Sequence, residues 1–233
     1  MINTREVVVT GAAGRIGRSI ASLLPRDWNL SRTDLVASED ITALNVTDPD
    51  ACRNAFSGAD AVVHLAANPD PTASWEQLLP SNIIGTYQVA HAAAECGVRR
   101  LVLASSLHAV SAIPHGTQTR TDDAPRPGNL YGATKAWAEA LGAWLSSSTA
   151  MSVVALPIGY FAEVRPDPAT PARERSAWLS PRDAAELVRA AVEADGSDFV
   201  VANGISANRY RVADLQGSAR QLGYRPNDDA WGS

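Results

Sequence analysis

The sequence predicts an α/β protein built on a doubly wound parallel sheet. Short apolar segments alternate with segments of helical spacing along the chain, which is the order that such a sheet requires. The apolar segments are nearly continuous, as in strands that are buried on both faces. Hydrophobic residues make up 45% of the 233 residues, which is enough for one full core. We therefore expect a single domain over residues 1–233.

The expected elements follow one another in a regular order. Strands are expected at 6–10, 28–31, 60–67, 99–105, 152–156 and 198–203. Helices are expected at 15–24, 47–56, 82–96, 129–145, 181–194 and 212–222. Pro49 suits the first turn of its helix, Gly97 ends the next one, and Ser180 caps the helix that begins at Pro181. Loops are expected at 113–129 and 157–180, and ligands should bind beyond the carboxyl ends of the strands.

Composition and charge exclude several classes of protein. The chain has 20 basic and 25 acidic residues, a net charge of −5 with no basic run, so nucleic-acid binding is not expected. No apolar run approaches the ~20 residues that span a bilayer, and the N-terminus does not resemble a signal peptide. Cys52 and Cys96 lack metal-ligand spacing, so no metal site is expected. These features predict a cytoplasmic protein without membrane partners.

The first expected strand is followed by the segment VTGAAGRIG, which contains Gly11, Gly14 and Gly17. Glycine permits a tight strand-to-helix turn and lets the backbone approach a pyrophosphate, which the free N–H groups of the helix then bind. The strand before the glycines and the helix after them are the context that a dinucleotide site needs. Near the second strand, Asp34 could bind both ribose hydroxyls and favour NAD, whereas Arg32 could pair with a 2′-phosphate and favour NADP.

Tyr131 and Lys135 lie four residues apart on one expected helix, so their side chains share a face. An ammonium beside a phenol favours the phenolate and lowers the phenol pKa from about 10 toward neutrality. A phenolate near neutral pH can take a proton from an alcohol or return it to a carbonyl. Ser106, at the end of a neighbouring strand, could hydrogen-bond the same substrate oxygen. Together these three residues predict acid/base catalysis.

The motifs TGAAGRIG, HLAA, NIIGT, ASS and YGATK occur in the order typical of the short-chain dehydrogenase/reductase superfamily. The chain resembles the extended, epimerase/dehydratase branch over essentially its whole length. The resemblance implies a Rossmann-like fold, NAD as cofactor, and Ser106, rather than Ser105, as the catalytic serine. It also implies that Lys135 binds the nicotinamide ribose and that Asn82 helps to hold a water relay. The implied cofactor-binding residues are Gly11, Gly14, Arg15, Ile16, Gly17, Asp34, Asn45, Val46, Leu65, Ala66, Ala67, Asn82, Tyr131, Lys135 and Ile158.

Within this branch the chain is most similar to uronate dehydrogenases, through WEQLLPSNIIGTY, ASSLHAV, LPIGYF and ARERSAWLS. The resemblance implies oxidation of a uronic acid at C1 to an aldarolactone. The implied substrate-binding residues are Ser106, Leu107, His108, Tyr160 and Arg173, with Arg173 on the carboxylate. Leu107 replaces an asparagine of that subfamily, Tyr160 replaces a small hydroxyl residue, and Pro157 replaces an arginine. A less polar or differently shaped substrate is therefore the alternative.

Only 77 residues follow Leu156, and they include an expected strand and two helices, so a small sugar-like substrate is expected. Segments 157–180 and 203–233 would form a small C-terminal cap over it. A sugar epimerase or a ketoreductase remains an alternative reaction on the same site, and a dinucleotide-sensing protein without turnover is an alternative of another class. The resemblance also allows a homodimer formed through the helix of Tyr131. Its apolar residues Trp137, Leu141 and Trp144 either face outward for such contacts or belong to the core.

Overall fold

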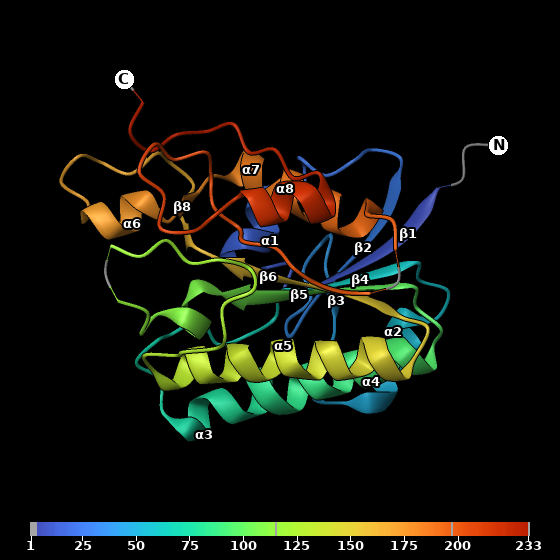
Figure 1. Cartoon of the computed structure of the whole chain (residues 1–233). Helices are drawn as coiled ribbons and strands as arrows, with labels where there is room; N and C mark the ends of the chain where they lie inside the picture. The colour runs from blue at the N-terminus through green and yellow to red at the C-terminus, as the bar shows by residue number, and fades with distance from the viewer. Residues whose placement is uncertain (1–3, 115, 197, 233) are drawn as a thin grey trace.

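The computed structural model describes residues 4–114, 116–196 and 198–232, and it contains a seven-stranded sheet in the order β3-β2-β1-β4-β5-β6-β9. Every pairing in this sheet is parallel (Figure 1). The strands are β1 (Arg5–Thr10), β2 (Trp28–Asp34), β3 (Thr42–Ala43), β4 (Ala61–His64), β5 (Arg100–Ser106), β6 (Ser152–Ile158) and β9 (Phe199–Val201). The strand order reverses between β1 and β4, which is the switch point of a doubly wound sheet. The expected fold class is confirmed.

Helices cover both faces of the sheet (Figure 1). One face carries α1 (Arg15–Ile20), α7 (Pro181–Glu193) and α8 (Gln216–Leu222), and the other carries α2 (Pro49–Phe56), α4 (Thr86–Glu95) and α5 (Leu130–Ser148). Shorter elements are α3 (Trp75–Leu78), the π-helix η1 (Leu79–Gly85), the 3₁₀ helix η2 (Leu107–Val110), α6 (Ala172–Ser176) and a two-stranded sheet of β7 (Tyr160–Phe161) and β8 (Trp178–Leu179). In the described part of the chain, no helix is long and apolar enough to cross a bilayer.

The apolar strands form two cores because successive side chains point to opposite faces. Val7 and Val9 of β1 pack with the α1 and α7 side of the sheet. Val8, between them, packs with Phe56 of α2 and Leu145 of α5 on the other side. Both cores therefore draw on the same strands, which explains why the strand sequences are apolar without alternation.

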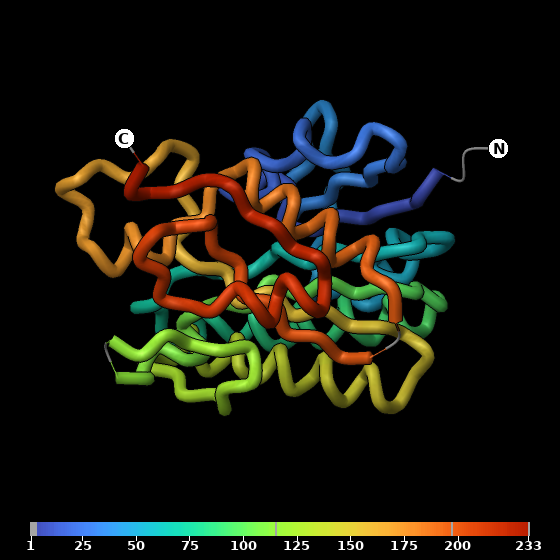
Figure 2. The backbone as a smooth tube through the Cα atoms, turned by 45° about the horizontal axis from the view of Figure 1, so that its top comes forward, coloured from blue at the N-terminus to red at the C-terminus, as the bar shows by residue number. Residues whose placement is uncertain are grey.

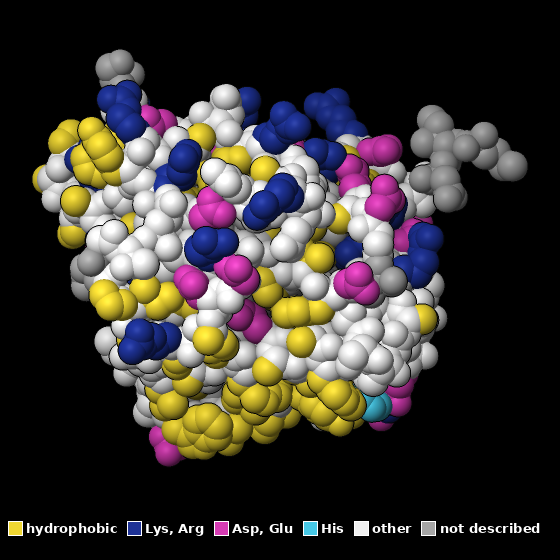
Figure 3. All heavy atoms as spheres, viewed as in Figure 1, with side chains coloured by type: hydrophobic (Ala, Val, Ile, Leu, Met, Phe, Trp, Pro, Cys, Tyr) yellow, Lys and Arg dark blue, Asp and Glu magenta, His cyan; other side chains and the backbone are white. Residues whose placement is uncertain are grey.

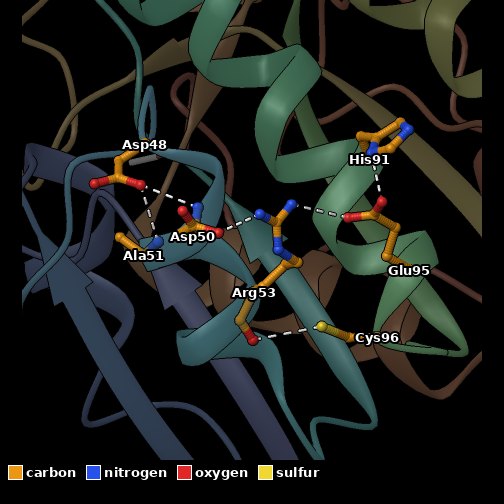
Figure 4. Close-up of polar contacts among 7 residues, drawn as sticks. All are labelled: Asp48, Asp50, Ala51, Arg53, His91, Glu95 and Cys96. Carbon is orange, nitrogen blue, oxygen red and sulfur yellow. Dashed lines mark hydrogen bonds and ion pairs between the residues drawn. The ribbon is translucent and has the colours of Figure 1, made fainter.

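The helices α2 and α4 are also joined by a polar network on the surface (Figure 4). Arg53 pairs with Asp50 of its own helix and with Glu95 of α4, the latter at 3.1 Å. Asp48 caps α2 by accepting hydrogen bonds from the backbone N–H groups of its first turn. Exposed pairs of this kind contribute at most ~1 kcal/mol, so the buried apolar contacts hold these helices together.

Several expected boundaries were wrong, and tertiary contacts explain the differences. The expected strand 60–67 ends at His64, because residues 65–67 turn to pass the glycine loop of β1. The expected helix 82–96 begins inside a π-helical segment. The expected helix 212–222 begins only at Gln216, because Thr119 hydrogen-bonds Val212 and Asp214 in a bridge.

The expected loop 157–180 contains more regular structure than its prolines indicated, namely β7, α6 and β8. The C-terminal segment lies beside it in both views of the backbone (Figures 1 and 2). Arg175 of α6 stacks over the ring of Trp231, with its guanidinium carbon 3.7 Å from the ring centroid. Buried Asp183 of α7 accepts hydrogen bonds from the backbone N–H groups of Asn227 and Asp228, at 2.8 and 3.0 Å. These contacts fix the C-terminal segment against segment 157–180 and against α7.

Candidate active site

The glycine turn after β1 lies at the carboxyl end of the sheet, between β1 and β4. Gly11 has a φ of +71°, a backbone conformation that favours glycine. A Cβ at Gly11 would lie 2.5 Å from the backbone nitrogen of Ala66, and one at Gly17 would lie 2.6 Å from the carbonyl oxygen of Gly11. Residues other than glycine would therefore clash at both positions. The backbone atoms of Leu65 and Ala66 lie against this turn, while the expected role of residues 65–67 in cofactor binding stays a prediction.

Helix α1 begins at this turn with Gly14 as its N-cap, and no side chain caps it. No acidic residue lies in its first turn, so the N–H groups of Arg15, Ile16 and Gly17 remain available to an anion. The narrow glycine turn and these donors fit the pyrophosphate of a dinucleotide.

Asp34 is the last residue of β2 and contacts the glycine turn directly. One carboxylate oxygen accepts a hydrogen bond from the backbone N–H of Ala13 at 2.9 Å, and the other accepts one from Leu35 at 2.7 Å. A carboxylate held there is placed to read an adenosine ribose beside the pyrophosphate. Arg32 is paired with Asp40 at 2.9 Å. This arrangement favours NAD over NADP.

The other expected cofactor residues lie around the same end of the sheet. Asn45 follows β3, and its side-chain oxygen accepts hydrogen bonds from the backbone and hydroxyl of Thr47. Val46 is buried, and its side chain leaves no room for a Cβ at Gly85. Asn82 is almost fully buried. Its side-chain oxygen accepts a hydrogen bond from the backbone N–H of Asn68, and its amide nitrogen donates to the carbonyl of Asn68 and to the hydroxyl of Thr134. Asn82 therefore ties the segment after β4 to α5.

Ser106, Tyr131 and Lys135 come together at the carboxyl end of β5. Ser106 ends β5 in register with Ile158 of β6, and its hydroxyl also accepts a hydrogen bond from the backbone N–H of His108 at 3.2 Å. Tyr131 and Lys135 are buried on one face of α5, with the lysine Nζ 5.6 Å from the tyrosine ring centroid. The same Nζ donates a hydrogen bond to the carbonyl of Ala104 in β5 at 2.8 Å. The three residues that the sequence singled out thus share one site.

Burial dominates the electrostatics of this group. It raises the pKa of the Tyr131 phenol above its usual value, while the hydrogen bond with Ser106 lowers that pKa. The expected decrease in the phenol pKa is therefore wrong for the protein alone, because desolvation outweighs the hydrogen bond with Ser106. Burial lowers the pKa of Lys135 to about 8, and the charge of Glu139 raises it. Burial lowers the pKa of His64, and the positive charge of Lys135 lowers it further, to about 3. His64 is therefore neutral at physiological pH.

Glu139 is a member of the site that the sequence reasoning missed. It lies one turn after Lys135 on α5, and its carboxylate accepts a short hydrogen bond from the Ser105 hydroxyl. Burial raises its pKa, whereas the Ser105 hydrogen bond and the Lys135 charge lower it. Its i+4 spacing from Lys135 was the available signal. Of the two adjacent serines, Ser105 thus binds Glu139 and Ser106 faces Tyr131.

A second group connects His108 to the start of α5. The Asn129 side-chain oxygen accepts a hydrogen bond from Gly132, so its amide nitrogen faces His108 Nδ1 at 2.8 Å and donates to it. Neutral His108 therefore carries its proton on Nε2. Its ring lies edge-on to Tyr131, with centroids 5.6 Å apart. Burial lowers the pKa of His108, and the positive charge of Arg173 lowers it further. Both effects favour the neutral form of the ring. Asn129 was not predicted, although an asparagine before a helix is a common N-cap.

Gly132 permits this close approach of η2 and α5. A Cβ at Gly132 would lie 2.2 Å from the carbonyl oxygen of His108. A glycine next to the tyrosine is therefore required by the packing of the site, and not by backbone conformation.

Beyond Ser106, a cavity of about 220 Å³ is lined by residues that include Leu107 and Arg173. Arg211, which the sequence reasoning missed, lines the same cavity. Tyr160 does not line it. Tyr160 begins β7, and its backbone N–H donates to the carbonyl of Ala177 at 2.7 Å. The structure thus brings Leu107, His108 and Arg173 together beside Ser106 and places Tyr160 at the base of the 157–180 segment.

The doubly wound sheet with a glycine turn at its switch point is the architecture of a dinucleotide-binding protein, and a tyrosine–lysine pair is buried at the same end of the sheet. The comparison with protein families agrees with this class: the model of the NAD dependent epimerase/dehydratase family matches residues 7–160. The chain belongs to this family, which confirms the resemblance to extended short-chain dehydrogenases/reductases.

Individual relatives cover nearly the whole chain. An L-arabinose 1-dehydrogenase (NAD(P)(+)) of Haloferax volcanii is 38% identical over 97% of this chain and 97% of its own length. An NAD-dependent glucose-6-phosphate dehydrogenase of the same organism is 36% identical over 97% of this chain and 94% of its own length. The crystal structure of uronate dehydrogenase from Agrobacterium tumefaciens matches with a TM-score of 0.88 and 29% identity, over 99% of this chain and 86% of that one. The chain thus resembles dehydrogenases of three different sugars.

Proposed function

We propose that this chain is an NAD-dependent dehydrogenase that oxidises the anomeric hydroxyl of a small sugar to a lactone. The observation that carries the proposal is the convergence of Ser106, Tyr131 and Lys135 in a buried site beside the glycine turn. NAD is the cofactor after which the family is named, and Asp34 favours it over NADP. The names of the relatives support a sugar substrate.

In the proposed mechanism, bound NAD⁺ supplies the hydride acceptor and the protein handles the proton. Tyr131 Oη takes the proton of the anomeric hydroxyl as the C1 hydride leaves. Ser106 Oγ donates a hydrogen bond to the same oxygen and orients it. The ammonium of Lys135 stabilises the phenolate while Tyr131 loses its proton, which offsets the raised pKa that burial imposes. Neutral His108 can donate through Nε2 to another sugar oxygen.

The choice of sugar is less sharply defined than the reaction. A uronic acid is the substrate that the sequence motifs predict, with Arg173 on its carboxylate. L-Arabinose and glucose 6-phosphate become candidates because relatives with higher identity than the uronate dehydrogenases carry those names. Leu107, at the cavity wall, lacks the polar group expected for a uronate dehydrogenase. The substrate class proposed here is therefore a small sugar with a free anomeric hydroxyl.

The test is NADH formation by the purified protein on galacturonate, glucuronate, glucose 6-phosphate and L-arabinose. Tyr131→Phe should lower kcat on the best substrate by ~10²- to 10⁴-fold, the usual contribution of an acid/base group. Tyr87→Phe, an exposed tyrosine on α4, is the matched control and should not change kcat. A loss below ~10-fold for Tyr131→Phe would refute the acid/base role. Sugar conversion without net NADH would indicate an epimerase instead.

We also propose that segments 157–180 and 203–233 form the cap over the substrate. The support is that α6 carries Arg173, that Arg211 lies in the second segment, and that both residues line the cavity beside Ser106.

For the quaternary structure we propose a homodimer through α4 and α5. Exposed apolar side chains gather over these helices and α3 (Figure 3), and they include Trp75, Ile84, Tyr87 and Trp144. Leu141 packs against the core, so Trp144 is the main outward residue of α5. A second copy could cover this face by twofold symmetry. Light scattering should give twice the chain mass, and Trp144→Glu should halve it; a monomeric wild type would refute the dimer.

A further inference from the structure

The cavity beside Ser106 has a strongly basic lining. Arg173 and Arg211 line it together with Thr117, and no carboxylate residue lines it in the described part of the chain. Leu107 and Val110 of η2 form its apolar wall next to the catalytic serine. Its volume of about 220 Å³ is below the ~300–1,000 Å³ of sites for drug-sized ligands, so it suits part of a small substrate.

Three separate chain segments build this cavity, and backbone hydrogen bonds join them. The N–H of Thr119 donates to the carbonyl of Val212 at 2.9 Å, which ties the 113–119 loop to the segment of Arg211. The N–H of Val212 donates to the carbonyl of Ser176 at 3.2 Å, in the helix that carries Arg173. The two arginines are therefore held at one cavity by the fold, although they lie far apart in sequence.

The position of the cavity relative to the acid/base group sets which part of a substrate could reach it. Leu107 and Val110 of η2 line the cavity, and Ser106 is the N-cap residue of the same short helix. The positive charge of Arg173 lowers the pKa of His108, whose ring lies edge-on to that of Tyr131. His108 therefore lies between the acid/base group and the arginine side of the cavity. A sugar with C1 at Tyr131 would extend its far end toward Arg173 and Arg211.

We propose that Arg173 and Arg211 form a phosphoryl-binding subsite, so that the sugar carries a phosphate group at the end away from C1. This inference deepens the proposed function and rests on it. A carboxylate has one negative charge, and one guanidinium can satisfy it bidentately. A phosphate monoester has a charge of about −1.5 to −2 at pH 7 and three acceptor oxygens, which match two guanidiniums and a neighbouring hydroxyl.

The test combines turnover with direct binding. The variants are Arg211→Ala, Arg211→Lys and the matched control Arg209→Ala, which removes an exposed arginine that does not line the cavity. Calorimetry with NADH-bound protein measures the affinity for inorganic phosphate. Steady-state kinetics compare glucose 6-phosphate, glucose and glucuronate. Arg211 is exposed, so its substitution should leave the fold intact, which circular dichroism checks.

We expect Arg211→Ala to weaken phosphate binding by ~10- to 100-fold and to lower the kcat/KM ratio of glucose 6-phosphate to glucose by a similar factor. Arg211→Lys should retain part of the binding, and Arg209→Ala should match the wild type. Equal phosphate affinity in wild type and Arg211→Ala would overturn the inference. It would also be overturned if Arg211→Ala lowered kcat/KM for glucuronate by the same factor as kcat/KM for glucose 6-phosphate. If no sugar is oxidised but phosphate binding still depends on Arg211, the subsite stands and the proposed function fails.

Discussion

Replacing Glu139 by glutamine should change the pH dependence of the reaction. Glu139 lies one helical turn from Lys135, and the pKa of Lys135 is lowered to about 8 by burial while Glu139 raises it. Removing the negative charge leaves the burial effect unopposed, so the pKa of Lys135 should fall further. A neutral Lys135 cannot stabilise the phenolate of Tyr131. The activity of Glu139→Gln should therefore decline at a lower pH than that of the wild type.

The size of the effect follows from the geometry. Side chains four residues apart on a helix lie ~6 Å apart, and two unit charges at that distance interact by roughly 3 kcal/mol at an effective dielectric of ~20. An interaction of up to that size corresponds to a decrease of ~1–2 in the pKa of Lys135 when Glu139 is replaced. With a pKa of about 8, Lys135 is ~90% protonated at pH 7. In the variant, this fraction should fall to ~10–50%.

We therefore expect kcat of Glu139→Gln to be ~2- to 10-fold lower at pH 7, and the loss to grow toward pH 8. His64 also faces Lys135, but its pKa of about 3 keeps it neutral throughout this range. The assay is kcat at saturating NAD and sugar between pH 6 and pH 9. Glu139→Asp should restore most of the profile, and Glu95→Gln, an exposed carboxylate on α4, is the control. Superimposable pH profiles for Glu139→Gln and the wild type would show that Glu139 does not set the pKa of Lys135.

Three further predictions concern the glycine of the catalytic helix, the cofactor and the cap. Gly132→Ala should lower kcat by at least ~10-fold, because its Cβ would meet the carbonyl of His108 at 2.2 Å and displace η2; kinetics near the wild-type values would contradict this. Asp34→Ala should raise the KM for NAD by ~10-fold or more and weaken the preference over NADP, since it removes a carboxylate from the ribose site; an unchanged coenzyme ratio would argue against that role. Asp183→Ala should lower the free energy of unfolding by ~2–4 kcal/mol in a denaturant titration, because it leaves the N–H groups of Asn227 and Asp228 without their acceptor; a loss below ~1 kcal/mol would contradict the importance of this contact.

Much of the fold could be predicted from local patterns. The nearly continuous apolar strands and the helical periods predicted a doubly wound sheet, and the order of β1, β4, β5 and β6 agrees. The boundaries were less predictable where long-range contacts decide them. The strand at 60–67 ends early because the glycine turn crowds residue 66, and the last helix starts late because Thr119 holds Val212. Neither partner is near in sequence, so no local pattern carried the information.

The site was predictable in its motifs but not in its supporting contacts. Ser106, Tyr131 and Lys135 lie together in the structure, as their order in the chain indicated. Their roles stay predictions until the variants are measured. Glu139 was recognisable only by its spacing from Lys135, and Asn129 only as a helix cap. The pKa of Tyr131 could not be read from the Tyr131–Lys135 spacing, because burial depends on everything packed around the ring.

The class of sheet, the glycine turn and the helix that carries Tyr131 and Lys135 follow from the sequence, because each depends on residues close together in the chain. Which distant side chains line the cavity next to η2 follows only from the tertiary structure. Arg173 and Arg211 are 38 residues apart, and only the hydrogen bonds among the 113–119 loop, α6 and the Val212 segment bring them to one cavity. Substrate recognition depends on such long-range contacts, whose partners local sequence patterns do not specify.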